Sequence, residues 1–237
     1  MSTTLLPSPD ETRLWTKEDS TTPAQTLEVH SIRRKQGLTK RAIDLSVLLV
    51  SAPLILPLLA GISIAIKLTS RGPVFYRQKR VGRLGQPFYA WKFRTMVRNA
   101  DEILQQYLAQ HPELRVEWER DHKLKKDPRV TRFGAMLRKT SLDELPQLLN
   151  VLMGQMSLVG PRPIVSAEIE KYAAAYDLYI VVTPGLTGLW QVSGRNNTTY
   201  GRRIELDTYY VRHWSLWLDM AILMRTFKTV MFCEGAY

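Results

Sequence analysis

Residues 45–66 read LSVLLVSAPLILPLLAGISIAI, a run without a charged side chain. At about 1.5 Å of rise per helical residue, a helix over this run is long enough to cross the roughly 30 Å hydrocarbon layer of a bilayer. Pro53 and Pro57 lie in its middle, and each removes a backbone donor and tends to kink a helix. The run therefore predicts a membrane helix that is broken near its centre.

Basic residues flank this apolar run on both sides. They are Arg33, Arg34, Lys35, Lys40 and Arg41 before it, and Lys67, Arg71, Arg77, Lys79 and Arg80 after it. Because cytoplasmic flanks of membrane helices collect Lys and Arg, a basic excess at both ends favours a re-entrant helix that enters and leaves on the same face. A straight span and a buried core helix are the alternatives, since the pattern alone also fits them.

Length and charge bound the rest of the chain. Its 237 residues suffice for one domain of ordinary size, and its formal net charge of +11 favours nucleic acid, an anionic membrane or a phosphate-rich substrate as partner. The single cysteine, Cys233, excludes an internal disulfide and a multi-cysteine zinc site. We expect a disordered polar tail without a signal peptide over 1–38, the membrane helix over 39–68 and a folded domain over 69–237.

A β-hairpin is predicted directly after the membrane helix. Its strands are expected at 74–78 and 88–96, on either side of a glycine-rich turn. The period of a strand places Tyr89, Trp91 and Phe93 on one face and Lys92 and Arg94 on the other. Two cations on one face are suited to holding phosphate groups, although a solvated strand face explains them as well.

The segment 140–150, TSLDELPQLLN, contains the adjacent carboxylates Asp143 and Glu144. Ser141, followed three residues later by Glu144, is the pattern of a capping box. It predicts a helix whose apolar positions are Leu145, Leu148, Leu149 and Leu152. This purely structural explanation competes with a catalytic one.

Residues 97–124, which precede this segment, predict a charged helix that is interrupted at Pro112.

Three segments rich in glycine, proline or asparagine predict tight loops at 160–163, 184–188 and 193–197. The first carries Arg162 and the third carries Arg195, and a rigid loop can orient the bidentate fork of an arginine toward phosphate oxygens. Ordinary turns with a surface arginine are the alternative. The last segment, 214–232, is apolar enough to lie on a bilayer surface, and a core helix explains most of the same pattern.

Six strings occur in the order of one family: KFRTM at 92–96, DPRVT at 127–131, TSLDELPQ at 140–147, LVGPRP at 158–163, PGLTG at 184–188 and QVSGR at 191–195. On these motifs the chain from about Lys40 onward resembles the bacterial sugar transferase family, the monotopic phosphoglycosyl transferases, and in particular its compact exopolysaccharide-initiating members. The resemblance implies an α+β, mainly helical, monotopic membrane protein. Its expected parts are a proline-broken re-entrant helix, interfacial amphipathic helices and a small cytoplasmic catalytic domain with a β-hairpin.

The resemblance also implies a two-step reaction on the bacterial inner membrane. Asp143 would attack the sugar-bearing phosphorus of UDP-glucose or UDP-galactose and expel UMP, and polyprenyl (undecaprenyl) phosphate would then accept the hexose phosphate. Glu144 would be the second catalytic carboxylate, and Mg²⁺ would be the cofactor, with Asp143 as its protein ligand. The expected phosphate-binding cations are Lys92, Arg94, Arg138, Arg162 and Arg195.

Three positions depart from the family pattern. The usual Ser-Pro break appears here as Leu56-Pro57, Gln155 stands where an Asp is usual, and Thr183 stands where a basic residue is common. The expected partners are the UDP-sugar, the lipid acceptor, the bilayer and downstream glycosyltransferases, without nucleic acid.

Two rival functions remain: a non-catalytic binding module and a second kind of enzyme, a metal-dependent glycosyltransferase. A membrane-tethered basic module for nucleic acid or anionic lipid explains the charge but not the Asp-Glu and Pro-Arg-Pro strings. A glycosyltransferase that leaves the phosphate behind is disfavoured because the chain contains no Asp-x-Asp. The product released from the donor separates them: UMP for the favoured reaction, UDP for the glycosyltransferase and none for the binding module.

Overall fold

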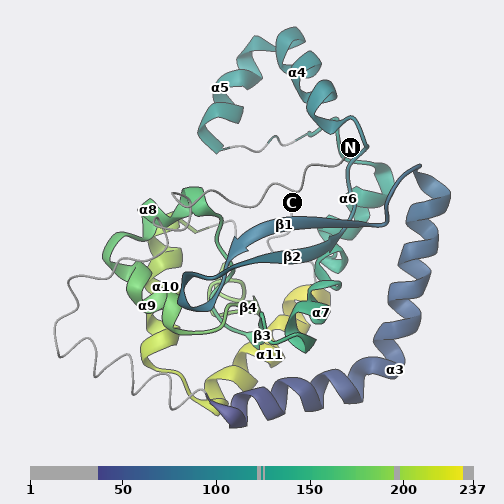
Figure 1. Ribbon diagram of the computed structural model, residues 1–237. Helices are drawn as coiled ribbons and strands as arrows, with labels where there is room; N and C mark the ends of the chain where they lie inside the picture. Colours follow the sequence, from purple (N-terminus) through teal and green to yellow (C-terminus); the bar gives the residue numbers. More distant parts are fainter. Residues whose placement is uncertain (1–36, 122–123, 125, 195–197, 232–237) are drawn as a thin grey trace, which may run out of the picture.

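The computed structural model describes residues 37–121, 124, 126–194 and 198–231, which form a mostly helical protein with two small sheets (Figure 1). The first half contains α3 (Leu38–Thr69), β1 (Phe75–Val81), η1 (Arg83–Gly85), β2 (Pro87–Phe93), α4 (Ala100–Gln110), α5 (Pro112–Asp121), α6 (Arg132–Lys139) and η2 (Leu142–Glu144). The second contains α7 (Gln147–Leu152), β3 (Ser157–Val159), η3 (Ser166–Glu168), α8 (Ile169–Tyr172), η4 (Ala173–Ala175), α9 (Tyr176–Val181), β4 (Gly185–Thr187), α10 (Tyr200–Arg212) and α11 (Leu216–Met231). The tail expected over 1–38 lies almost wholly outside the described residues.

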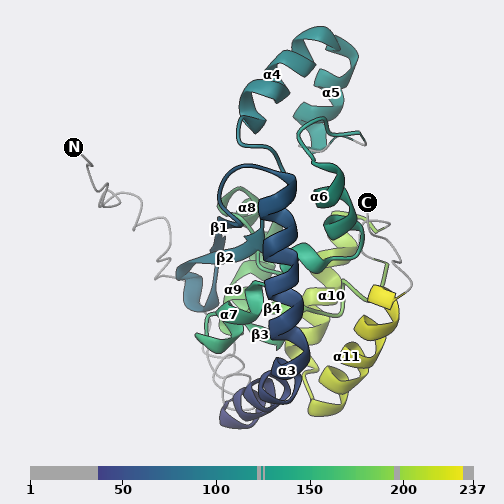
Figure 2. The same ribbon diagram turned by 90° about the vertical axis from the view of Figure 1, so that its right-hand side faces the viewer.

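Helix α3 is the apolar run, and it bends sharply midway into two limbs (Figures 1 and 2). The bend coincides with Pro53 and Pro57, neither of which can donate to the carbonyl one turn earlier. Two residues before the first proline, the Ser51 hydroxyl donates to Val47 O at 2.7 Å. Within the described residues, α3 is the one helix with the length and composition to cross a membrane, and hardly any of its most apolar part is buried. A buried core helix is therefore the wrong alternative.

Both limbs of α3 dock on the same folded body. In the first limb the buried Lys40 donates to Asp219 and to the Tyr210 hydroxyl, and Asp44 accepts a hydrogen bond from Leu158 N at 3.1 Å. In the second limb, apolar side chains pack against β2 and α6 in a cluster built around Ile62, Ile66, Phe93 and Leu137. The bent helix is thus held to the protein at each end.

Strands β1 and β2 form the predicted hairpin as an antiparallel pair that joins Phe75 to Phe93 and Val81 to Pro87. The second sheet is a short parallel pair of β3 and β4. The prediction of a loop at 184–188 is therefore wrong, because these residues contain a strand. Close packing of this strand requires glycine, since a Cβ on Gly185 would lie 2.1 Å from Gly160 N.

The largest core cluster lies where α7, α10 and α11 meet β2, β3 and β4; its fully buried members include Val151, Met156, Val159, Tyr210 and Ile222. Helices α4 and α5 form an arm that stands away from this body (Figures 1 and 2). Their junction at Pro112 confirms the predicted interruption of the charged helix. The site described next lies at the hairpin, η2 and the loop after β3.

Candidate active site

Asp143 and Glu144 lie on η2, a three-residue 3₁₀ turn that is separate from the helix after it. The predicted capping box is wrong, because Ser141 adopts a left-handed conformation (φ 58°) and its side chain does not cap the turn. Helix α7 begins only at Gln147, directly after Pro146, whose fixed φ suits the start of a helix. The two carboxylates are therefore presented by a tight turn and not by the first turn of a long helix.

The Glu144 carboxylate is engaged by two cations from distant parts of the chain. Lys92 Nζ and Arg162 Nη2 each donate to Glu144 Oε1 at 2.7 Å, and Arg162 Nη1 donates to Oε2 at 3.2 Å. Burial alone would raise the pKa of Glu144, but the charges of Arg162 and Lys92 hold this pKa well below its usual range. Glu144 is therefore a fixed anion, and the hydrogen-bonding capacity of Oε1 is already used.

The pKa of the neighbouring Asp143 is shifted in the opposite direction. Burial and the adjacent Glu144 charge raise the pKa of Asp143, against the opposing influence of Lys92, Arg138 and Arg162. Within the described part of the chain, no side chain donates a hydrogen bond to its carboxylate. Asp143 thus keeps its lone pairs available for an electrophile or a cation.

The other predicted phosphate-binding cations divide into three cases. Arg138, in the last turn of α6, acts electrostatically on Asp143, and its Nε donates to Thr95 Oγ1 at 2.9 Å. Arg94 is turned toward the end of α3, where its Nη2 donates to Ser70 O at 2.9 Å and to Ser70 Oγ at 2.6 Å. Arg195 lies outside the described residues. The structure therefore groups Lys92, Arg138 and Arg162 around the two carboxylates and engages Arg94 elsewhere.

A turn with adjacent Asp and Glu side chains, surrounded by three cations, can be compared with known proteins. The sequence profile described as bacterial sugar transferase matches residues 35–233. The chain belongs to this family.

Several named relatives share more than two-fifths of their aligned residues with this family member. It is 49% identical to the undecaprenyl-phosphate galactose phosphotransferase of Salmonella typhimurium, over 86% of this chain and 43% of that protein. It is 44% identical to the exopolysaccharide production protein ExoY of Sinorhizobium fredii, over 89% of this chain and 93% of that protein. It is 41% identical to the UDP-glucose:undecaprenyl-phosphate glucose-1-phosphate transferase of Klebsiella pneumoniae, over 84% of this chain and 41% of that protein. The chain thus spans about two-fifths of the length of some relatives and nearly all of another.

A metal ion in this family member would depend on few protein ligands. Among the described residues, no group of three or more His, Cys, Asp or Glu side chains is placed to hold one. Mg²⁺ is commonly held by one or two carboxylates together with substrate phosphates and water. Because Glu144 is bound to Lys92 and Arg162, Asp143 is the carboxylate of the pair that fits this role.

Sequence reasoning missed two features beside the Asp-Glu turn of this family member. Asn150 fastens α7 to β2: its Oδ1 accepts from Trp91 N at 3.0 Å, and its Nδ2 donates to Tyr89 O at 2.8 Å. Gln155, one of the departures from the family pattern, accepts from the same Nδ2 at 2.7 Å. The available signal was an asparagine between the apolar Leu149 and Val151, because an amide that is buried with such neighbours is usually hydrogen-bonded.

The second missed feature is a buried group of charges on the far side of Arg162. Glu168 pairs with Arg203 at 3.1 Å, and Arg80 lies 4.0 Å from the same carboxylate. Asp207, one helical turn beyond Arg203, accepts a hydrogen bond from the Tyr172 hydroxyl at 2.7 Å. Burial raises the pKa of Asp207 to about 6. The sequence had suggested only a membrane-flanking role for Arg80.

Proposed function

We propose that the protein transfers a hexose 1-phosphate from a UDP-sugar to polyprenyl phosphate and releases UMP. The observation that carries this proposal is the contrast between two adjacent carboxylates. Glu144 is held by Lys92 and Arg162, whereas Asp143 has no hydrogen-bond donor among the described residues. Such a pair suits a mechanism in which Asp143 reacts while Glu144 holds the cations in place.

The proposed chemistry has two displacements. In the first, an oxygen of Asp143 forms a bond to the β-phosphorus of the donor, and the bond from this phosphorus to the bridging oxygen breaks, so that UMP leaves with the electron pair. In the second, an oxygen of the acceptor phosphate attacks the aspartyl-bound phosphorus and Asp143 leaves as a carboxylate. The product is polyprenyl diphosphate hexose, and no oxidant or further reactant is needed.

Charge neutralisation is the main demand of this reaction, because an anion attacks an anion. Arg138 and Arg162 bring fixed positive charge to Asp143, and Lys92 adds a third cation beside Glu144. When bound at Asp143, Mg²⁺ would supply Lewis-acid stabilisation of the phosphate charge. In this proposal Arg138 and Arg162 attract the phosphate oxygens by their charge and donate to them through guanidinium N–H groups other than those bound to Thr95 and Glu144.

The sugar remains a choice between two donors. One relative is named for galactose and another for glucose, and both are more than 40% identical to this chain. We propose UDP-galactose or UDP-glucose as donor and, by analogy with ExoY, a role in starting exopolysaccharide synthesis.

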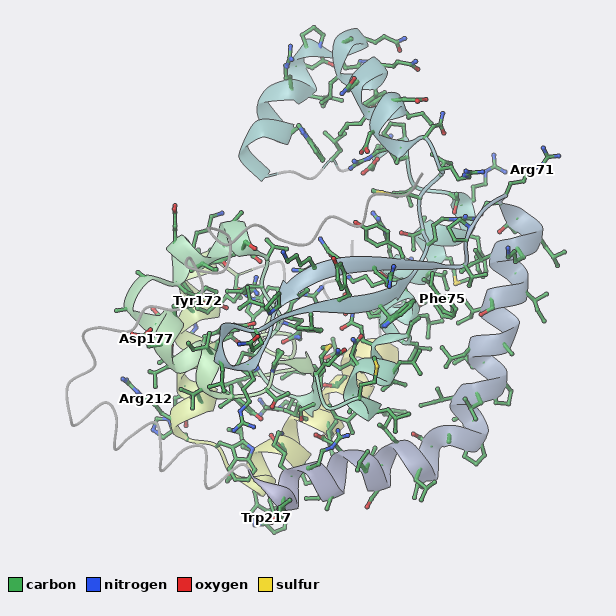
Figure 3. The ribbon with its side chains drawn as sticks, in the orientation of Figure 1. Arg71, Phe75, Tyr172, Asp177, Arg212 and Trp217 are labelled. Carbon is green, nitrogen blue, oxygen red and sulfur yellow. The ribbon has the colours of Figure 1, made fainter. Side chains whose placement is uncertain are left out.

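The structure also supports a membrane location with both ends of α3 on one side. Its limbs dock on the same body, Lys40 with Asp219 in one case and Ile62 with Phe93 in the other. Figure 3 shows Trp217 beside the beginning of α3 and Arg71 just beyond its end. A straight span would separate these ends by the full hydrocarbon thickness. We therefore propose a re-entrant helix in the bacterial inner membrane, with the catalytic body in the cytoplasm.

Exposed apolar side chains extend this membrane surface beyond α3. On α11, Trp217 is 85% exposed, and Met224 and Phe227 are also exposed. Tryptophan is enriched at the headgroup level of bilayers. Helix α11 is thus suited to lie along the interface, as the expected amphipathic helix.

The test is a donor screen with the purified full chain in detergent, polyprenyl phosphate and Mg²⁺. We expect UMP from UDP-galactose or UDP-glucose, and a labelled lipid that carries both the hexose and the donor's β-phosphate. Release of UDP would support a glycosyltransferase instead. Lack of any nucleotide product with all donors would support a binding module.

A further inference from the structure

In the loop that presents Arg162, each backbone carbonyl from 161 to 164 accepts a hydrogen bond. Its carbonyls at positions 161, 163 and 164 accept from Gly185 N at 2.8 Å, Arg80 Nη1 at 3.0 Å and Val81 N at 2.9 Å, respectively. The Arg162 carbonyl lies 3.4 Å from Arg203 Nη2, which donates to it. Two prolines in the loop have no N–H to satisfy. The backbone around Arg162 is therefore specified by contacts from several elements.

The next two residues of the loop are held by side chains. Ile164 N donates to the Tyr179 hydroxyl at 3.1 Å, and this hydroxyl donates to Val81 O at 3.3 Å. Val165 N donates to Glu168 Oε2 at 2.9 Å. Tyr179 and Glu168 thus fasten the loop to β1 and to η3.

Arg80, Arg162 and Arg203 are close enough for their charges to act on one another. Burial and the charge of Arg162 lower the pKa of Arg80, and Arg203 acts in the same direction. Glu168 counters this repulsion, because its Oε1 accepts from Arg203 Nη1 at 3.1 Å and its Oε2 lies 4.0 Å from Arg80 Nη1. Glu144 pairs with Arg162, and Asp207 lies 3.8 Å from Arg203 Nε, so part of this charge is neutralised elsewhere. Glu168 is the carboxylate that lies within 4.0 Å of both Arg80 and Arg203, and its loss would leave the repulsion between these two uncompensated on that side.

We propose that Glu168, together with Arg80, Tyr179 and Arg203, forms a clamp that positions Arg162 for phosphate binding. The inference rests on the proposed transfer reaction. Glu168 touches none of the reacting groups in this scheme: its oxygens are used by Val165 N, Tyr200 and the arginines. Glu168 acts through Arg162, whose guanidinium group must stay directed toward Glu144. Glu168 and Tyr179 are accordingly positioning residues and not catalytic ones.

The first experiment replaces Glu168 by Gln in the full chain. Glutamine keeps an acceptor for Val165 N but removes the negative charge that offsets the repulsion between the arginines. We expect kcat/KM for the UDP-sugar, measured by UMP release, to fall about tenfold, which corresponds to ~1.4 kcal/mol. The matched control is Glu205→Gln, which removes an exposed carboxylate paired with Arg202 and should change kcat/KM by less than about twofold.

The second experiment separates positioning from general stability with a double-mutant cycle. If the clamp acts through the fork of Arg162, Glu168→Gln in an Arg162→Lys background should cost no more than about a further twofold. A full additional tenfold loss, or equal activities of Glu168→Gln and Glu205→Gln, would overturn the proposal.

The Tyr179→Phe variant tests the same loop without a change of charge. Its hydroxyl bonds to Ile164 N and Val81 O, so its removal should loosen the same loop. We expect a several-fold loss of kcat/KM that again disappears in the Arg162→Lys background. This variant decides the matter if Glu168→Gln does not fold, and an unchanged kcat/KM would then reject the clamp. A wild-type protein that releases no UMP would instead reject the proposed function.

Discussion

The two adjacent carboxylates should respond to neutralisation in opposite ways when stability is measured. Glu144→Gln removes the anion shared by Lys92 and Arg162, whose nitrogens lie 2.7 Å from Glu144 Oε1. Breaking a buried pair by removing one partner costs about 3–5 kcal/mol, and the partial exposure of both cations favours the lower end. For a domain of this size, ~3 kcal/mol corresponds to a fall in Tm of roughly 6–12 °C.

Asp143→Asn should leave Tm unchanged or raise it slightly. Burial and the Glu144 charge disfavour the ionised form of Asp143, so a neutral residue of the same shape relieves a cost. Both variants should lose UMP release, Asp143→Asn because the nucleophile is gone and Glu144→Gln because Lys92 and Arg162 lose their anchor.

The assay is thermal unfolding of the detergent-solubilised full chain at neutral pH, with a chelator and without donor. Glu205→Gln, on the exposed side of α10, is the control for a generic loss of one negative charge. A fall in Tm for Asp143→Asn as large as that for Glu144→Gln would refute the electrostatic contrast. Near-normal turnover of Asp143→Asn would refute its assignment as the nucleophile.

Three further predictions concern the bend of α3, the docking of its first limb and the pH dependence of stability. Replacing Pro53 and Pro57 together by Ala restores two backbone donors and improves helix propensity by roughly 3 kcal/mol per site, so it should straighten α3. Labelling of a cysteine at residue 38, in a Cys233→Ser background, should then shift toward the periplasm; unchanged labelling and activity would show that the bend does not need the prolines. Asp219→Asn leaves the buried Lys40 without its anion and should lower Tm by several degrees, whereas an unchanged Tm would mean that this pair does not hold the first limb. Because the pKa of Asp207 is raised to about 6, the folded state binds the extra proton between about pH 4 and 6, and its free energy of unfolding should fall as pH rises through this window. Relative to Asp207→Asn, the wild type should lose on the order of 3 kcal/mol between pH 4 and 7 in urea titrations, and parallel pH curves would contradict this.

Local patterns predicted the elements whose formation depends on near neighbours. The hairpin, the break at Pro112 and a bend at the two prolines were readable, because alternation and missing backbone donors act within a few residues. The capping box failed for a tertiary reason. The side chain of Glu144 binds Lys92 and Arg162, and these charge-assisted hydrogen bonds stabilise the structure more than a hydrogen bond to a local cap would. The loop expected at 184–188 is a strand because β3 pairs with it across the chain.

The sequence by itself determined the motifs, their order, the apolar helix with its prolines and the presence of the Asp-Glu pair. It did not distinguish the two carboxylates, which are chemically almost alike and adjacent in the chain. Lys92 is 52 residues from Glu144 and Arg162 is 18 residues away, so only the folded chain brings both to one carboxylate and leaves Asp143 without a donor in the described residues. The same holds for the clamp of Glu168 and Tyr179 around Arg162. The electrostatic state of a group depends on charges and burial around it in space, which residue spacing along a chain does not encode.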